Sequence, residues 1–138
     1  MNLLFYAKAR GEEGLRLLQV IEESFPEGSV EIFRTADRFA RRLRQPGDDE
    51  MVAVVLAADR EDLNHIFGMQ SLLENMRLVL ILPSRQKGMI AMAHRLRPRY
   101  LAFKDGDFGD VAAVLTTMAK KAGGAEKSAA MAGQAGSR

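Results

Sequence analysis

Cysteine is missing from all 138 residues, which excludes disulfide frameworks, thiolate metal sites and cysteine nucleophiles. Long apolar runs are missing as well: a stretch such as 78–83 is far shorter than the roughly 20 residues that a membrane-spanning helix needs. The N-terminus lacks the basic, then apolar, then small-residue pattern of a signal peptide. We therefore expect a cytoplasmic protein with no membrane partner.

The chain also lacks an excess of one charge sign. Its 20 Lys and Arg residues against 18 Asp and Glu residues leave a formal charge of only +2. Within the last 17 residues, Lys127 and Arg138 outweigh Glu126, so this segment supplies +1 of that charge and the rest is close to neutral. The pI of about 9.1 thus overstates the basic character, and we expect no nucleic-acid partner.

The domain organisation follows from length and composition. With 47% hydrophobic residues, the chain can bury the core of one globular domain. From Ala122 onward, however, small residues dominate and offer almost nothing to bury, so the entropy lost on ordering has no compensation. The sequence predicts one domain over residues 1–121 and a disordered Gly- and Ala-rich tail over 122–138.

Short apolar runs alternate with segments of helical period, and this alternation predicts five strands. The third and fourth runs are apolar at consecutive positions, which is typical of strands covered on both faces by helices. The predicted strands are Leu3–Ala7, Val30–Arg34, Met51–Ala57, Arg77–Leu82 and Tyr100–Phe103.

Five helices are predicted between and after these strands, because apolar residues there recur at spacings of three and four. A (βα)₅ order with right-handed crossovers predicts a flavodoxin-like, three-layer α/β fold, in which a doubly wound parallel sheet has the strand order 2-1-3-4-5. The apolar positions of the helices are Leu18, Ile21 and Phe25; Ala36, Phe39, Ala40 and Leu43; Leu63, Ile66, Phe67 and Leu73; Ile90, Ala93 and Leu96; and Phe108, Val111, Leu115 and Met118.

The loops after the strands show no catalytic motif. Gly11 and Gly14 are too few for a phosphate-binding loop, and Glu12 and Glu13 suit the positive end of the first helix better than a cation site. His65 and His94 lack ligand-like spacing to each other or to carboxylates, which disfavours a metal site. We expect neither an enzyme nor a bound cofactor or metal.

Polar residues at the ends of strands three to five have structural interpretations. Asp59 is placed to cap the third helix, with Asp62 in its first turn, and Ser84 is a candidate cap for the fourth. Ser84 has no recognisable His or Asp partner, so it is not predicted to be a nucleophile. Lys104 has two interpretations: its ammonium group points across the crevice at the strand ends, or it is solvated.

The order of elements, especially from Met51 to Leu115, resembles the receiver domain of two-component response regulators (CheY-like proteins) over residues 1 to about 121. The stretch Arg97-Pro-Arg-Tyr-Leu-Ala-Phe-Lys-Asp-Gly-Asp-Phe-Gly-Asp-Val-Ala-Ala-Val-Leu115 is similar to a receiver's fifth strand, lysine and fifth helix. The resemblance implies an acidic pair for Mg²⁺ after strand one, a phosphorylated aspartate ending strand three, a hydroxyl after strand four and a lysine after strand five.

The sequence departs from that pattern at the metal and phosphorylation positions. Lys8 and Ala9 occupy the place of the acidic pair, and Ala57 the place of the phosphorylated aspartate, with Asp59 two residues later. Ser84 matches the hydroxyl, with Pro83 as the competing match. Lys104 matches the family's lysine, with Phe103 as the competing match. If Tyr100 is instead aligned with the family's switch aromatic, Lys104 no longer aligns with the lysine unless a gap is introduced. We therefore predict a pseudo-receiver in which the Lys8 cation fills the metal site, whereas Asp59, Ser84 and Lys104 form a phospho-acceptor site or its vestige.

The predicted function is non-catalytic, phosphorylation-independent binding of a protein partner, such as a signalling kinase or an output protein, with a homodimer as a second form. The predicted interaction surface comprises Arg95, Arg97, Arg99 and Tyr100, cationic and aromatic groups of the kinds enriched at interfaces. The competing interpretation of these residues is a solvated basic turn. Two alternative functions are a true phospho-receiver using Asp59 and a small-molecule or anion binder using Lys8, Arg10 and Lys104.

Overall fold

A computed structural model of the chain describes residues 2–8, 11–25, 29–45, 51–74 and 76–131, with side chains described up to residue 120. Five parallel strands form one sheet in the order β2-β1-β3-β4-β5, which confirms the predicted fold and strand order. The strands are β1 (Asn2–Ala7), β2 (Ser29–Phe33), β3 (Met51–Leu56), β4 (Arg77–Leu82) and β5 (Tyr100–Phe103).

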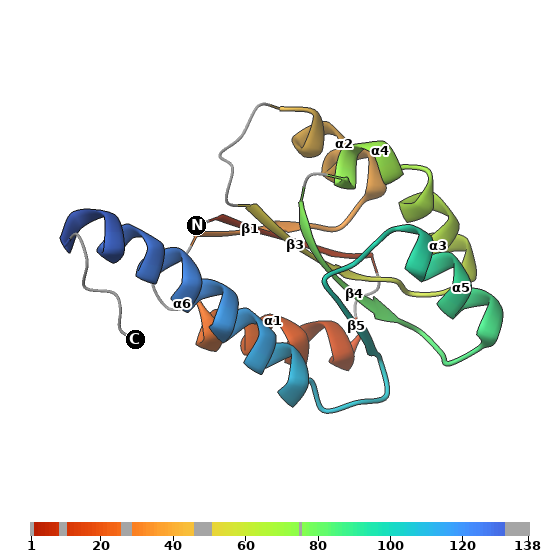
Figure 1. Ribbon diagram of the computed structural model, residues 1–138. Helices are drawn as coiled ribbons and strands as arrows, with labels where there is room; N and C mark the ends of the chain where they lie inside the picture. The colour runs from red at the N-terminus through yellow and green to blue at the C-terminus, as the bar shows by residue number, and fades with distance from the viewer. Residues whose placement is uncertain (1, 9–10, 26–28, 46–50, 75, 132–138) are drawn as a thin grey trace.

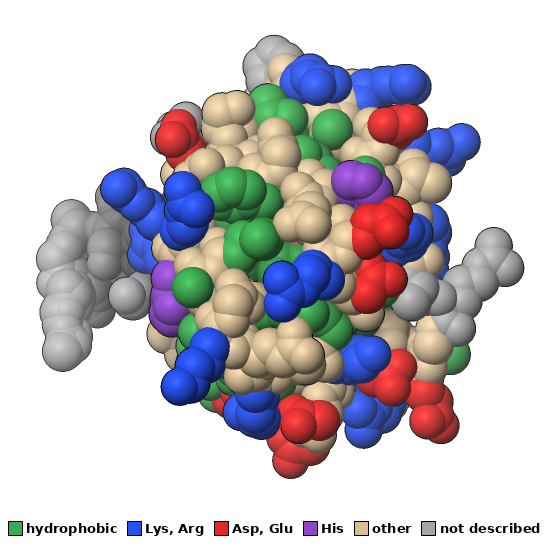
Figure 2. All heavy atoms as spheres, turned by 90° about the vertical axis from the view of Figure 1, so that its right-hand side faces the viewer, with side chains coloured by type: hydrophobic (Ala, Val, Ile, Leu, Met, Phe, Trp, Pro, Cys, Tyr) green, Lys and Arg blue, Asp and Glu red, His purple; other side chains and the backbone are tan. Residues whose placement is uncertain are grey.

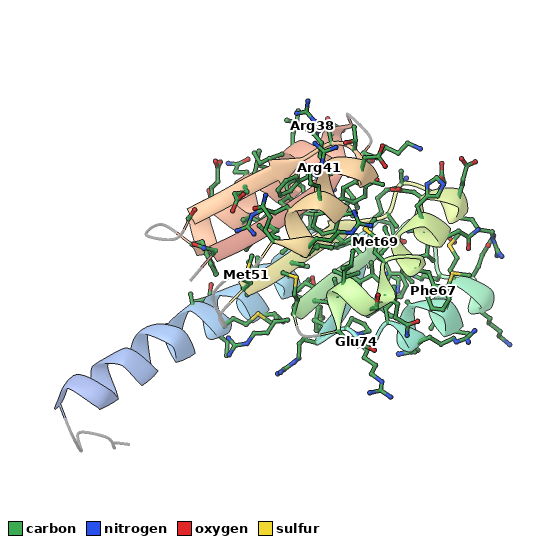
Figure 3. All side chains as sticks on the ribbon, turned by 90° about the horizontal axis from the view of Figure 1, so that it is seen from above. Arg38, Arg41, Met51, Phe67, Met69 and Glu74 are labelled. Atoms are coloured by element: carbon green, nitrogen blue, oxygen red, sulfur yellow. The ribbon has the colours of Figure 1, made fainter. Side chains whose placement is uncertain are left out.

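Helices cover both faces of the sheet, as Figure 1 shows. One face carries α1 (Glu12–Ser24) and α6 (Gly109–Met131). The opposite face carries α2 (Ala36–Arg44), α3 (Arg60–Phe67), α4 (Gln70–Leu73) and α5 (Lys87–Arg95), which are seen together from above in Figure 3. Among the helices of the described ranges, none is both long and apolar enough to cross a membrane.

The two faces of β3 explain its uninterrupted apolar run. All six of its residues are buried; Val52, Val54 and Leu56 pack under α1 and α6, whereas Met51, Ala53 and Val55 pack under α2 to α5. A strand between two helical layers has no solvent-facing side, so alternation with polar residues is lost.

Two helices differ from the predicted boundaries. The third predicted helix is divided: α3 ends at Phe67, and α4 begins at Gln70 after a turn at Gly68 and Met69. Glycine is a weak helix former, and here the Met69 N–H donates to the Ile66 carbonyl at 2.9 Å, three residues back, which tightens the turn. At the other end of the chain, α6 extends to Met131, past the domain boundary predicted at 121. Residues 132–138 of the predicted tail lie outside the described residues.

Candidate functional site

The carboxyl ends of β1 and β3 meet at the switch point of the sheet. Ala7 pairs with Leu56 there, so Lys8 and Ala57 occupy the next positions. Ala57 is fully buried, and its backbone N–H donates to the carbonyl of Ile81 at 3.0 Å, which extends the pairing with β4. Lys8 is exposed. Directly after these two strands the chain therefore presents an ammonium group and a methyl group, neither of which supplies the carboxylate oxygens that Mg²⁺ prefers.

Asp59 lies just beyond Ala57 and caps α3. Its Oδ1 atom accepts a hydrogen bond from the backbone N–H of Asp62 at 2.8 Å, and its backbone is extended, as is usual for a capping residue. The structure confirms the capping role predicted for Asp59. Because one Asp59 carboxylate oxygen already accepts the capping hydrogen bond, a phosphoryl group on Asp59 would compete with the hydrogen bond that starts α3.

A buried carboxylate that sequence reasoning treated only as a first-turn residue lies directly behind this edge. Asp62 is 0% exposed, and its two oxygens have different partners. Oδ1 accepts from the hydroxyl of Tyr6 at 2.7 Å, and Oδ2 accepts from the backbone N–H of Ala58 at 2.9 Å. The carboxylate thus ties β1 and the β3–α3 turn together, since a buried charge is stable only when it is hydrogen-bonded.

The environment of Tyr6 strengthens this link. The Tyr6 ring stacks on Phe39 of α2 with 5.2 Å between ring centroids. Burial, and then the hydrogen bond to Asp62, raises the pKa of the Tyr6 hydroxyl well above its ordinary value of 10.0, so the group stays protonated and keeps donating. A tyrosine hydroxyl within the apolar run of β1 was the only sequence signal of this pair, and its partner is 56 residues away.

Ser84 and Lys104 lie at the ends of the neighbouring strands β4 and β5. The Ser84 hydroxyl makes two long contacts, donating to the Met89 sulfur at 3.4 Å and accepting from the Gln86 N–H at 3.4 Å. Ser84 is not the cap of α5, because that helix starts at Lys87 and has Gln86 in the capping position. Lys104 is half-buried and its backbone N–H donates to the Leu82 carbonyl at 2.8 Å.

Phe103 is the last residue of β5, and Lys104 begins the turn that follows. Phe103 packs against the core under α5, and the guanidinium group of Arg85 lies over its ring at 4.1 Å from the centroid. Arg85 also forms an exposed ion pair with Asp105 at 3.1 Å. The Phe103 side chain is therefore part of the packing around α5.

The acidic residues of α1 do not complete a metal site with these groups. Glu12 and Glu13 lie in the first turn of α1, as predicted. Across the residues whose side chains are described, no three His, Asp or Glu groups are placed to hold a metal ion. Arg10, the third cation of the predicted anion site, lies outside the described residues.

The structure separates the residues of the predicted interaction surface. Arg95 ends α5 and lies over the Phe67 ring of α3, at 5.3 Å from the centroid. Together with Arg97 it lines a polar hollow of ≈ 540 Å³ that also includes Gln70 and Glu74 of the α4 region. Figure 2 shows Lys and Arg side chains spread over the face that includes α3 and α5, with apolar side chains in the gaps.

Arg99 and Tyr100 lie on the other side of the turn, toward α6. The Tyr100 hydroxyl donates to Asp110 of α6 at 2.7 Å, and this hydrogen bond raises the pKa of Tyr100. Arg99 lines a second pocket, against the middle of α6. The backbone changes direction between Arg95 and Arg99 at Arg97, which has a left-handed conformation with a φ of 54° directly after the C-cap Leu96.

Comparison with solved structures shows the same fold in several proteins. A putative pilus assembly protein of Burkholderia thailandensis matches with a TM-score of 0.60 and 16% identity, covering 90% of this chain and 98% of its own. A CheY-like response regulator receiver domain of Methanospirillum hungatei matches with a TM-score of 0.56 and 12% identity, covering 87% and 97%. No family model and no curated protein matches the chain.

The chain has the fold of CheY-like receiver domains. A third similar structure shows what the receiver fold can hold: a response regulator of Burkholderia pseudomallei, at 12% identity and a TM-score of 0.58, contains a phosphorylated aspartic acid and a calcium ion. It covers 91% of this chain and 72% of its own. In this chain, the residues that directly follow β1 and β3 are the exposed Lys8 and the buried Ala57.

Proposed function

We propose that this chain is a non-catalytic regulatory module of the receiver type that binds a protein partner without being phosphorylated. The observation that carries the proposal is the composition of the strand edge: Lys8 and Ala57 stand where a receiver needs carboxylates. Aspartyl phosphorylation depends on a divalent cation to offset phosphoryl charge, and that ion requires nearby carboxylate oxygens. Neither an ammonium nor a methyl group can supply them.

The two aspartates that remain near the edge support the same proposal. Asp59 is used as a helix cap, and Asp62 is enclosed and bonded to Tyr6 and Ala58. A carboxylate that holds the β3–α3 turn in one conformation also removes the freedom that a phosphorylation switch in this turn would need. The module is therefore proposed to present one constant surface to its partner.

We propose that the partner docks on the face formed by α5, β5 and α6. This face has two cationic parts, Arg95 and Arg97 on the α5 side and Arg99 on the α6 side. The partly buried Leu101 and Phe103 of β5 add apolar surface, and such a composition suits a protein interface. Two similar solved structures are described as putative pilus assembly proteins, so components of such an apparatus are the first partners to test. Pairing of two copies through the same face is the second proposed form, which sedimentation at increasing concentration would detect.

The decisive experiment adds Mg²⁺ and beryllofluoride, a stable phosphoryl analogue, and follows backbone amide NMR signals near Asp59, Ser84 and Tyr100. Signals that stay unchanged support a phosphorylation-independent module. Saturable shifts in the wild type that disappear in Asp59→Asn would refute the proposal and establish the alternative, a true phospho-receiver using Asp59. If Mg²⁺ without beryllofluoride shifts the same amide signals, the argument that Lys8 prevents cation binding would be contradicted.

A further inference from the structure

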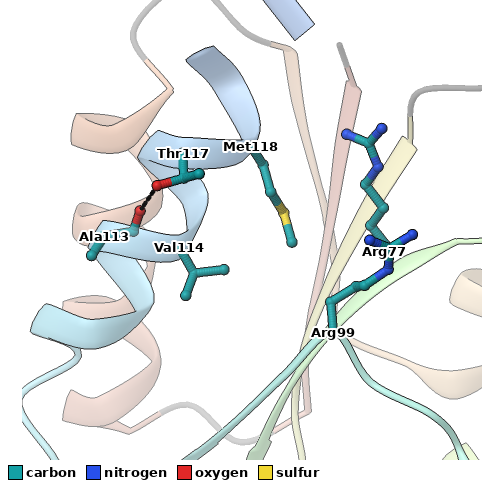
Figure 4. A pocket seen from close by; sticks show the side chains of 6 residues that line it. All are labelled: Arg77, Arg99, Ala113, Val114, Thr117 and Met118. Atoms are coloured by element: carbon teal, nitrogen blue, oxygen red, sulfur yellow. Dashed lines mark hydrogen bonds between the residues drawn. The ribbon is translucent and has the colours of Figure 1, made fainter. Parts of the chain in front are cut away.

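A pocket of ≈ 390 Å³ opens at the amino ends of β4 and β5, the sheet edge opposite to the receiver-type crevice. Its volume falls within the range of small-molecule sites. One wall is α6, and the other is formed by the residues that start the two strands (Figure 4). The described residues that line it are Arg77, Arg99, Ala113, Val114, Thr117 and Met118.

The strand wall carries two arginines, whose backbones the sheet holds side by side. Arg77 is the first residue of β4, and Arg99 directly precedes β5. The Arg99 N–H donates to the carbonyl of Leu78 at 2.7 Å, which fixes Arg99 beside the residue that follows Arg77. The ion pairs recorded among the described residues join Arg42 to Glu31 and Arg85 to Asp105, so neither pocket arginine takes part in one.

The helix wall is apolar and has no spare donor pointing at an anion. Val114 and Met118 are one turn apart on α6, and the Met118 thioether extends toward the arginines in Figure 4. The Thr117 hydroxyl, the one polar side-chain group of this wall, donates to the Ala113 carbonyl at 2.9 Å within the helix. The pocket thus has a cationic side and a separate apolar side.

We propose that this pocket binds a small amphiphilic anion, with its carboxylate or phosphate head between Arg77 and Arg99 and its apolar chain on Val114 and Met118. Two guanidinium forks can each donate two parallel hydrogen bonds to one such head, and the anion relieves the repulsion between the two like charges. The Met118 thioether and the branched Val114 side chain provide adaptable apolar contact for the hydrocarbon part of the ligand. This site shares Arg99 and α6 with the proposed docking face, but its ligand is a small molecule and its binding is measured without a partner protein. It lies away from Lys8 and Lys104.

The test uses hexyl phosphate, inorganic phosphate and hexanol as probes with the full chain, followed by amide NMR. Hexyl phosphate is expected to shift the signals of Arg99, Val114 and Met118 saturably, with a dissociation constant in the millimolar range or below. Inorganic phosphate and hexanol should each bind at least about ten-fold more weakly, because each lacks one half of the contacts. Hexanoate in place of hexyl phosphate then shows which anionic head the arginines prefer.

Variants assign the binding to the pocket. Arg77→Gln and Arg99→Gln should each weaken hexyl phosphate binding by about ten-fold or more, since each removes a charged hydrogen-bonding fork. Val114→Thr keeps both arginines and the shape of the side chain that faces them in Figure 4, but it replaces a methyl group with a hydroxyl group. It should therefore weaken hexyl phosphate binding and leave inorganic phosphate binding unchanged. Arg38→Gln, an exposed arginine on α2 across the sheet (Figure 3), is the matched control and should bind like the wild type.

Several results would overturn the proposal. Equal affinity for hexyl phosphate and inorganic phosphate would mean that the apolar side of the pocket contributes nothing to binding. Equal weakening by Arg38→Gln and Arg77→Gln would mean general attraction to a cationic surface. Unchanged hexyl phosphate binding in Val114→Thr would place the apolar part of the ligand elsewhere. Circular dichroism and denaturant midpoints of each variant distinguish loss of the site from loss of the fold.

Discussion

The hydrogen bond between Tyr6 and Asp62 should be a major local contribution to stability, and Tyr6→Phe tests it. The substitution keeps the ring that stacks on Phe39 and removes only the hydroxyl that donates to the fully buried Asp62 carboxylate. A hydrogen bond to a charged group is worth about 1.5–3 kcal/mol, and an enclosed carboxylate that loses a donor cannot turn to water instead. We expect the free energy of unfolding to fall by about 1.5–3 kcal/mol.

The chain supplies a matched control for this prediction. Tyr100 donates to Asp110 at the same 2.7 Å, but the pair is exposed, so water replaces the lost donor in Tyr100→Phe. The control should therefore change the free energy of unfolding by less than about 0.5 kcal/mol. Urea denaturation of both variants measures the difference, and equal effects of the two substitutions would refute the reasoning that burial makes the Tyr6 bond strong.

A double-mutant cycle and a pH titration extend the test. Adding Asp62→Asn to Tyr6→Phe should cost less than the sum of the two single changes, because both remove the same contact. In a Tyr100→Phe background, Tyr6 is the only remaining tyrosine and the chain has no tryptophan, so phenolate absorbance reports Tyr6 alone. The raised pKa predicts that absorbance to appear only on unfolding.

The sign of the pH dependence follows from that shift. Below pH 10 the Tyr6 hydroxyl is protonated in both states, so its contribution to stability is fully present. Above pH 10 the unfolded chain loses this proton while the native state retains it, and the free energy of unfolding should fall by up to about 1.4 kcal/mol per pH unit. Native protein with an ionised Tyr6 near pH 10 would contradict the burial argument.

Three further predictions concern single residues. Asp59→Ala should lower the free energy of unfolding by about 1 kcal/mol and weaken the protection of α3 amides in hydrogen exchange, because it removes the α3 cap; an unchanged denaturant midpoint would count against the cap. Arg97→Gly should raise the free energy of unfolding by up to about 1 kcal/mol, and with it the thermal midpoint, since glycine adopts the φ of 54° without strain. A lower midpoint would mean that the Arg97 side chain contributes more to stability than its backbone strain costs. Asp105→Asn should change stability by less than about 1 kcal/mol because its ion pair with Arg85 is exposed, and a larger loss in urea denaturation would refute that.

Local sequence patterns determined the secondary structure and the strand order. A run of consecutive apolar residues from Met51 predicted a central strand, and the structure covers that strand on both faces. Such patterns are readable because a strand or helix repeats over a few neighbouring residues and must bury its apolar side. The crossover rule then left few ways to order five strands. The cap at Asp59 was predictable for the same reason, since a capping residue acts within three positions of itself.

Contacts between distant residues were decided only by the tertiary structure. The Tyr6–Asp62 bond joins residues 56 positions apart, and no local period marks such a pair. The four residues predicted as one interaction surface lie within residues 95–100, yet a left-handed turn at Arg97 sends Arg95 toward α3 and Arg99 toward α6. Sequence spacing sets which residues are available, whereas the direction of each side chain depends on backbone angles and packing that are established only when the chain folds.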